Sequence, residues 1–411
     1  MPASAILKDV RELTRHKGFA KLALARFISN CGNGITPIAM SFGVLGLPGG
    51  SASQLSLVLG SQMIPLLLFM LFGGVVGDRY KRNKIVGGSD IIGSLFVLVS
   101  ASSFIFGFVS IPLLCIMGAL FGFLNALWWP AFSGVLPEIV PKGELQRANS
   151  VIGLLSNFGY TAGALVGGML VAVAGSGWAL FCDALSFFVA GVLVWSIDLP
   201  RILRSDDGTM FKQLKVGWRE FISRRWVVSV VIAFTFINFA YESTLGVLGP
   251  LATKESGHGA REWSLVLAVS TIGMILTGLA LLRIPLKKPL VYGIAPMLLM
   301  ATWIFSISLS ATIIIPIVIS FFAGVAIEVF YVAWSTSMQN NIPEEAYSRV
   351  ISYDALGSYA LAPLGLIFIG PIAERIGTDN ALYILSTLVV VATVTALSVR
   401  DVRLVRNETR I

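Results

Sequence analysis

The sequence predicts an all-α membrane protein with twelve transmembrane helices in two six-helix bundles that are related by a parallel repeat. Hydrophobic residues make up 56 % of the 411 residues and charged residues 13 %, whereas about a quarter of the residues in a soluble domain are charged. The mean hydropathy is +0.83, and many apolar runs are long enough to cross the ~30 Å of hydrocarbon in a bilayer. An internal repeat divides these runs into two equal sets.

Twelve apolar runs follow a polar, charged start. Residues 1–18 carry apolar and basic residues at helical spacing and are expected to lie as a cytoplasmic N-terminal segment on the inner membrane face. The spans are expected at residues 19–45, 54–77, 85–106, 111–135, 148–173, 177–197, 227–250, 263–282, 289–308, 313–336, 350–373 and 380–399.

Basic residues are distributed unequally between the two ends of these spans. Of the 30 Lys and Arg residues, 25 lie in the segments on the side of the termini and three lie in the opposite loops. The positive-inside rule therefore places both termini in the cytoplasm and predicts a multi-pass protein of the inner or plasma membrane. The net charge of +8 is explained by attraction of these segments to anionic lipid head groups, so no nucleic-acid partner is expected.

The longest polar interruption, residues 198–226, divides the chain near its middle. It predicts a cytoplasmic linker between a six-helix bundle at 19–197 and a second bundle at 227–399, with a cytoplasmic tail at 400–411. The second part of the linker favours an interfacial helix over a disordered linker, because its apolar residues have helical spacing. These residues are Phe211, Leu214, Trp218, Phe221 and Ile222.

An internal repeat supports two equivalent halves. Residues 140–150 recur at 342–352 with Pro, Arg and Ser at matching positions. Arg147 and Arg349 are therefore expected to occupy equivalent positions in a parallel repeat. The same offset of 202 residues aligns three glycines of the first half with three of the second, namely Gly122 with Gly324, Gly163 with Gly365 and Gly168 with Gly370.

The loop between the second and third spans carries the most distinctive motif. Residues 73–85 read GGVVGDRYKRNKI, so glycines that permit close helix contact precede a carboxylate and several bases. An ordinary basic loop between two membrane helices is the alternative. The order G-x-x-G-D-R-x-x-R-x-K resembles the signature loop of the major facilitator superfamily of transporters. The resemblance implies the major facilitator fold and a conformational-switch loop formed by Gly74, Asp78, Arg79, Arg82 and Glu138.

In that superfamily the matching Asp interacts with the start of the eleventh helix. The resemblance therefore implies that Asp78 lies near Ser352 and that Arg79 or Arg82 reaches Glu138.

Within this superfamily the chain is most similar to the drug-antiporter branch, which includes macrolide, tetracycline and siderophore exporters. The segments that carry this resemblance are Trp129–Ala131, Leu136–Pro141, Arg147–Ser150 and Asp183–Phe187. The fifth span also resembles the antiporter signature helix, through Gly159, Gly163, Gly167 and Gly168. The alternative for these glycines is helix packing alone, because small residues at this spacing are common in membranes.

Ionisable residues inside the spans are costly in hydrocarbon and mark functional positions. They are Arg26, Asp90, Asp183, Glu242 and Glu328, with Asp354 near the start of the eleventh span. The resemblance implies that the first, fourth, seventh and tenth helices line the transport path, which makes Arg26, Glu242 and Glu328 the proton-coupling candidates. Glu328 lies nearest to mid-membrane. For Asp90 and Asp183, on the third and sixth spans, a structural hydrogen bond between helices is favoured.

The four path-lining helices also carry amide and aromatic side chains. Such a mixture suits a cavity for a moderately large amphipathic substrate, and ordinary core packing is the alternative for the aromatic residues. The substrate-cavity candidates are Asn30, Asn33, Asn125, Trp128, Trp129, Asn238, Tyr241, Phe330 and Tyr331.

Three functions remain after the sequence is searched for enzyme motifs. It has no Walker A loop, nucleophile elbow or cluster of metal ligands, so no enzyme, cofactor or metal site is expected. The first function is a proton-coupled secondary exporter of small amphipathic organic molecules, such as an antibiotic, a drug or a siderophore, that works by alternating access. The second is an uptake permease of the same fold, and the third is a membrane sensor or assembly protein that does not transport. The resemblance favours export, with a small-molecule substrate, protons and membrane lipids as the partners of a monomer.

Overall fold

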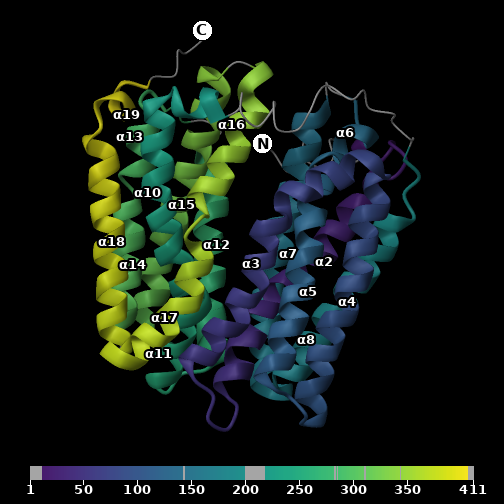
Figure 1. The fold of residues 1–411 in the computed structure, drawn as a ribbon, viewed down its shortest axis with the longest axis vertical. Coiled ribbons are helices and arrows are strands. Elements are labelled where there is room, and N and C mark those ends of the chain that lie inside the picture. The colour runs from purple at the N-terminus through teal and green to yellow at the C-terminus, as the bar shows by residue number, and fades with distance from the viewer. Residues whose placement is uncertain are drawn as a thin grey trace. The chain divides into compact units, whose positions relative to one another are not determined.

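Every regular element that the structure describes is a helix (Figure 1). The computed structural model describes residues 12–141, 144–199, 218–281, 284, 286–309, 312–342 and 344–405. The first half contains α2 (Phe19–Leu45), α3 (Ala52–Arg79), α4 (Arg82–Phe106), α5 (Ile111–Ser133), α6 (Val135–Ile139), α7 (Leu145–Ala174) and α8 (Ser176–Trp195). The second half contains α10 (Arg225–Ser243), the π-helix η2 (Thr244–Leu248), α11 (Gly249–Glu255), α12 (Ala260–Leu281), α13 (Pro289–Ile294), α14 (Met297–Ser308), α15 (Ile314–Asn341), α16 (Glu344–Ser358), α17 (Ala362–Ile376), α18 (Thr378–Ser398) and α19 (Arg400–Leu404).

Eleven helical segments in the described part of the chain are long and apolar enough to cross a membrane. The helix α2 is the twelfth span. It has 27 residues, or about 40 Å at a rise of ~1.5 Å per residue, and its Lys21, Arg26, Asn30 and Asn33 lower its hydropathy. The twelve-helix, all-α membrane fold predicted from the sequence is confirmed.

The chain divides into two compact units. Unit 1 comprises Met1–Gly50 and Leu57–Ser205, and unit 2 comprises Ser51–Ser56 and Asp206–Ile411. In unit 1, α2 packs on α7 and α8, and α4 packs on α5 and α8. In unit 2, α12 packs on α15, α14 packs on α15 and α18, and α10 packs on α16, α17 and α18.

The segment Ser51–Ser56 belongs to unit 2 because it contacts α17. The backbone N–H and the hydroxyl of Ser53 both donate to the Glu374 carboxylate, with donor–acceptor distances of 2.8 and 2.5 Å. The N–H of Gly370 donates to Ser56 Oγ at 2.9 Å.

The internal repeat is visible in the turns between helices. Gly175 joins α7 to α8 with φ 88°, and Gly377, 202 residues later, joins α17 to α18 with φ 90°. A positive φ favours glycine, which has no Cβ to clash with the backbone. The same turn therefore uses the same residue in both units.

Close helix contacts repeat in the same way. Gly122 of α5 lies against the backbone of Gln62 in α3, and Gly324 of α15 lies against the backbone of Ser270 in α12. In each case a Cβ would overlap the carbonyl oxygen of the facing helix. The glycines permit the close approach of two backbones that is common in membrane helices.

A second pair of contacts fixes the numbering of the repeat. Gly163 of α7 lies against the backbone of Cys31, and Gly365 of α17 lies against that of Phe239. The facing residues differ by 208 in number in both contact pairs, whereas the glycines differ by 202. Early residues of the two units therefore correspond at an offset of 208 and later residues at 202, which confirms the parallel repeat.

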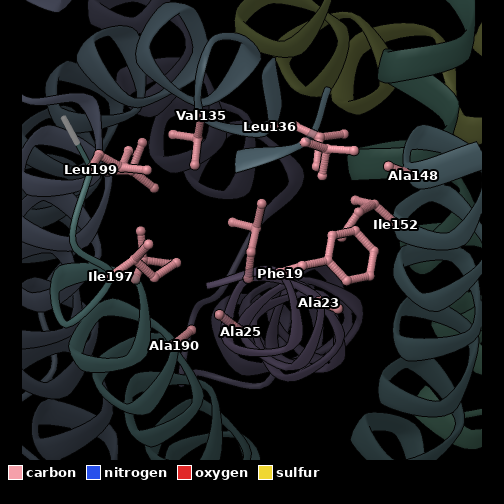
Figure 2. Packing of buried hydrophobic residues seen from close by; sticks show 14 of the residues in the cluster. Phe19, Ala23, Ala25, Val135, Leu136, Ala148, Ile152, Ala190, Ile197 and Leu199 are labelled. Atoms are coloured by element: carbon pink, nitrogen blue, oxygen red, sulfur yellow. The ribbon is translucent and has the colours of Figure 1, made fainter. Parts of the chain in front are cut away.

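A hydrophobic cluster fills one end of unit 1 (Figure 2). It gathers Phe19 of α2, Leu136 of α6 and Ile152 of α7, and Ile197 and Leu199 follow α8 into it. Such burial of apolar surface contributes about 25 cal/mol per Å² in water. The cluster fixes the start of α4 as well, because the buried Asn83 amide donates to the Ile197 carbonyl at 2.6 Å.

The linker is described only in its last part. Phe211 and Leu214 lie outside the described residues, and residues 218–222 are helical. The Trp218 ring lies 5.7 Å from the Phe221 ring and 5.4 Å from the Tyr353 ring of α16. This end of the linker therefore packs its aromatic side chains on unit 2.

Candidate functional site

In unit 1 the charged residue of α2 packs on two aromatic rings of α5. The guanidinium carbon of Arg26 lies 4.9 Å from the Trp128 ring centroid and 4.5 Å from that of Phe132. The two rings, here called the unit-1 aromatic pair, stack on each other at 4.6 Å. Their faces offer the cation favourable quadrupole contacts in a region with little water.

A buried carboxyl group lies near the positive charge of Arg26. Asp90 of α4 is 6 % exposed and lies within electrostatic range of both Arg26 and the Trp128 indole. Within the described residues, Arg26 Nε and Trp128 Nε1 are buried without a hydrogen-bond partner of normal geometry. Asp90 therefore lies near a cation and an indole N–H of neighbouring helices, and the structural hydrogen bond between helices predicted for it stays a prediction.

Asp183 of α8 is held by hydroxyl groups. It is fully buried, the Thr36 hydroxyl of α2 donates to its Oδ2, and Ser186 Oγ lies 3.4 Å from its Oδ1. Gly32 permits this approach of α2 to α8, because a Cβ there would overlap the Asp183 carboxyl group. The hydrogen bond between helices predicted for this residue is present.

In unit 2 the acidic side chain of α15 faces a glycine. Glu328 of α15 is partly buried, and its Oε1 lies 3.1 Å from the position that a Cβ would take at Gly278 of α12. Among the residues that the structure describes, Glu328 forms no ion pair with Lys, Arg or His. This carboxyl group therefore lies at the interface of α15 and α12 without a compensating base among the described residues.

The eleventh span is broken, which the sequence reading did not anticipate. The helix α16 ends at Ser358 and α17 begins at Ala362, with Tyr359 to Leu361 forming a turn. Pro363 explains the break, because proline has no N–H for the carbonyl four residues earlier and its ring clashes with that carbonyl. In the sequence, this break is marked only by a proline inside the span expected at residues 350–373.

Side chains of α10 satisfy the carbonyl groups at the break. Thr235 Oγ1 donates to the Gly357 carbonyl at 2.8 Å, and Asn238 Nδ2 donates to the Ser358 carbonyl at 2.9 Å. Backbone groups freed by a helix break in a membrane need such partners, because hydrocarbon offers none. Asn238, predicted as a cavity residue, thus positions the broken helix.

Carboxyl groups and aromatic rings surround the break. Asp354 of α16 accepts hydrogen bonds from Trp334 Nε1 at 2.9 Å and from Ser358 Oγ at 3.0 Å. Glu242 lies on the same face of α10 as Asn238, one turn further along. Both carboxyl groups lie within electrostatic range of the Tyr359 hydroxyl. A π-helix follows at Thr244–Leu248, and such segments are frequent at functional sites.

The other cavity candidates fall into two groups. The Asn30 and Asn125 amides donate to carbonyls one turn back in their own helices, to Arg26 and Phe121, and Asn33 is partly buried. The aromatic candidates differ in exposure: Trp129 is 54 % and Tyr331 64 % exposed, whereas Trp128 is 7 % exposed. The ring of Tyr241 packs on Trp303. The ring of Phe330 stacks on Phe234 at 3.6 Å and on Trp334 at 5.9 Å. Phe330 and Trp334 are here called the unit-2 aromatic pair.

The switch loop is described in part. Arg82 Nε lies 3.6 Å from Glu138 Oε1, and both side chains are mostly buried. A Cβ at Gly134 would overlap the Arg82 guanidinium, so this glycine makes room for the ion pair. The backbone at Gly74, Asp78 and Arg79 is helical within α3; the side chains of Asp78, Arg79, Ser352 and Arg349 lie outside the described part of the chain.

The glycines of the antiporter-type helix contact α2. Gly159, Gly163 and Gly167 of α7 lie against the backbone at Phe27, Cys31 and Ile35 in turn, and Gly168 is also buried. This regular spacing of four residues brings α7 close to α2 over about two helical turns. The arrangement agrees with helix packing, and an antiport role for these glycines stays a prediction.

Comparison with known proteins identifies the family. The family described as Major Facilitator Superfamily matches residues 22–365. The chain belongs to this superfamily. It is therefore a multi-pass membrane transporter and not an enzyme.

Individual relatives cover nearly the whole chain at low identity. Multidrug efflux pump Tap of Mycolicibacterium fortuitum is 24 % identical over 382 residues, which cover 89 % of this chain and 91 % of the pump. Macrolide efflux protein A of Streptococcus pyogenes is 23 % identical over 376 residues, covering 86 % and 89 %. A variant of the nucleoside transporter NupG has a similar crystal structure, with a TM-score of 0.75 at 13 % identity and coverage of 93 % and 99 %; this likeness shows the fold alone.

Proposed function

We propose that this superfamily member is a proton-coupled secondary exporter of small amphipathic organic molecules. The observation that carries the proposal is Glu328, a carboxyl group on α15 that faces Gly278 and has no base among the described residues. Burying an unpaired carboxylate costs several kcal/mol, so such a group exchanges a proton when its surroundings change. A transport cycle that alternates access from one side to the other supplies that change.

Export is supported by the relatives. Two of the similar proteins are named as a multidrug efflux pump and a macrolide efflux protein. The basic residues of the loops support a plasma-membrane protein with both termini in the cytoplasm. In this orientation the Arg82–Glu138 ion pair and the rest of the switch loop lie on the cytoplasmic side.

The test is substrate accumulation in inverted membrane vesicles with an imposed pH gradient, acidic inside. A panel of amphipathic antibiotics and siderophores supplies the substrates. We expect wild type to accumulate a substrate in exchange for protons. Glu328→Gln abolishes this gradient-driven accumulation but preserves substrate binding and downhill exchange, because the amide cannot carry a proton. Glu255→Gln, at an exposed residue, is the matched control and retains accumulation.

Two outcomes contradict the proposal. Gradient-driven accumulation by Glu328→Gln at wild-type rates places the proton site elsewhere, with Glu242 as the next candidate. Accumulation only in right-side-out vesicles reverses the direction and makes the chain an uptake permease.

A further inference from the structure

The membrane-embedded part of unit 2 contains acids without bases. Its spans at 227–250, 263–282, 289–308, 313–336, 350–373 and 380–399 contain no Lys, Arg or His. They contain three acids, Glu242, Glu328 and Asp354. Acidic groups in a low-dielectric region attract cations strongly, and no basic side chain in these spans competes for them.

The repeat identifies the residue of unit 1 that is equivalent to Glu242. At the offset of 208, Glu242 corresponds to Gly34 of α2 in unit 1. A Cβ at Gly34 would overlap the backbone of α7 at Tyr160 and Ala164. Unit 1 therefore packs two continuous helices in close contact where unit 2 has a carboxyl group beside a broken helix.

The two acids near the break differ in their partners. Asp354 already accepts hydrogen bonds from Trp334 and Ser358. Glu242, in contrast, has neither a hydrogen bond nor an ion pair to any described residue. The adjacent Ser243 hydroxyl is fully buried, faces Gly365 one turn beyond the break, and has no hydrogen-bond partner either. Two neighbouring polar side chains at this helix interface thus lack a hydrogen-bond partner among the residues that the structure describes.

Aromatic rings lie near the acids at the break. Trp334, which donates to Asp354, stacks on Phe330, and Phe330 stacks on Phe234 of α10. The Tyr359 hydroxyl lies in electrostatic range of both the Glu242 and the Asp354 carboxyl groups. Rings of this kind bind the apolar body of an organic cation and interact favourably with its charge. The combination is the usual composition of a small-molecule site, with apolar walls and a few polar groups.

We propose that the break between α16 and α17, together with Glu242 on α10, forms a subsite that binds the positively charged group of an organic substrate. Glu242 is the counter-charge, and Asp354 and Tyr359 complete the polar surface. Thr235 and Asn238 position the break. The subsite deepens the proposed function by naming organic cations as the substrate class, and it rests on that function.

Equilibrium binding tests the subsite without any gradient. The full-length protein is purified in detergent, and binding of radiolabelled tetraphenylphosphonium is measured at constant pH. Tetraphenylborate, an anion of the same size and shape, is the matched probe for charge. We expect the cation to bind and the anion not to bind.

Glu242→Gln weakens binding of the cation by about tenfold or more, because the loss of one modest charge interaction raises the Kd about tenfold. Glu242→Asp keeps the charge and recovers part of the affinity, and Glu255→Gln binds like wild type.

Several results overturn the subsite. They are failure of the wild type to bind tetraphenylphosphonium, equal binding by wild type and Glu242→Gln, and an equal loss in Glu242→Gln and Glu242→Asp. Melting curves of each purified variant separate loss of binding from loss of folding. The proposed function fails separately: cation binding that depends on Glu242, with no accumulation driven by a pH gradient, refutes proton-coupled export and leaves the subsite intact.

Discussion

The aromatic pairs of the two units occupy equivalent positions and have different partners. Trp128 and Phe132 correspond to Phe330 and Trp334 at the offset of 202, and both pairs stack. In unit 1 the guanidinium of Arg26 lies over the pair. In unit 2 the residue at the offset of 208 is Phe234, which stacks on the pair instead.

This difference divides charge unequally between the units. Unit 1 places a cation on its aromatic pair within electrostatic range of Asp90, whereas the residue 208 positions after Asp90 is the apolar Leu298. Unit 2 has three acids in its spans and no base. The comparison teaches that one fold, duplicated, places a cation on its aromatic pair near an acid in one copy and has carboxyl groups without a base in the spans of the other. Stability is expected to depend on the first, and coupling on the second.

The largest effect on stability is expected from removing the cation that packs on the unit-1 aromatic pair. Arg26→Met loses the contacts with the Trp128 and Phe132 rings and leaves the buried Asp90 without a cation in electrostatic range, at a cost of about 2 kcal/mol or more for a desolvated cation–π contact. Thermal unfolding of the purified variant measures this as a lower melting temperature. Lys21→Met, at an exposed residue of the same helix, is the control and changes stability by no more than about 0.5 kcal/mol.

A double variant sharpens this prediction. Arg26→Met combined with Asp90→Leu imitates the apolar arrangement of unit 2 and is expected to recover most of the lost stability. An Arg26→Met protein as stable as wild type would show that Asp90 does not depend on Arg26.

The close helix contacts at Gly122 and Gly324 are expected to lose similar amounts of stability when alanine replaces the glycine. Gly122→Ala and Gly324→Ala each insert a Cβ against a facing backbone carbonyl, and overpacking of this kind costs about 1–3 kcal/mol. Gly153→Ala in α7 is the control, since a Cβ there has open space and removes glycine from a helix interior. Melting temperatures of the three variants measure these effects. A large loss in one repeat variant and none in the other would mean that the two contacts are not equivalent.

The smallest effect is expected at the asparagine pair. Asn30 and Asn238 correspond at the offset of 208, but Asn30 donates to its own helix and Asn238 to the broken helix. Asn238→Ala leaves the Ser358 carbonyl without this part-buried hydrogen bond, at about 1 kcal/mol, the lower end of the cost of an unsatisfied group. Asn30→Ala costs less, because the Arg26 carbonyl that it bonds lies within a continuous helix. Thermal unfolding of the two variants compares these losses of stability. Equal losses in Asn30→Ala and Asn238→Ala would mean that the asparagine facing the broken α16–α17 span does no more than the asparagine facing the continuous helix α7.

Much of the fold follows from the sequence because it depends on local composition. Apolar run length predicts spans, and a constant offset between similar segments predicts the repeat. Asp183 could also be predicted, because a buried acid in an apolar helix needs a hydrogen-bond partner on a neighbouring helix. The proximity of Arg26 to Asp90 could not, since helix order along the chain does not say which residues of α2 and α4 come within electrostatic range of each other. Pro363 is compatible with the break at Tyr359 but does not predict it, because Pro37 and Pro65 lie inside continuous helices. The α10 side chains that hold the break depend on tertiary packing.

The central claim is that the uncompensated acid of unit 2, and not a satisfied acid of unit 1, carries the proton. The most direct test compares Glu328→Gln with Asp183→Asn at equal amounts in inverted vesicles with an acidic interior. Both changes replace one carboxyl group by an amide, but Asp183 is held by the Thr36 and Ser186 hydroxyls. The account predicts that Glu328→Gln loses gradient-driven accumulation and that Asp183→Asn retains it. Retention by Glu328→Gln together with loss by Asp183→Asn would contradict the account.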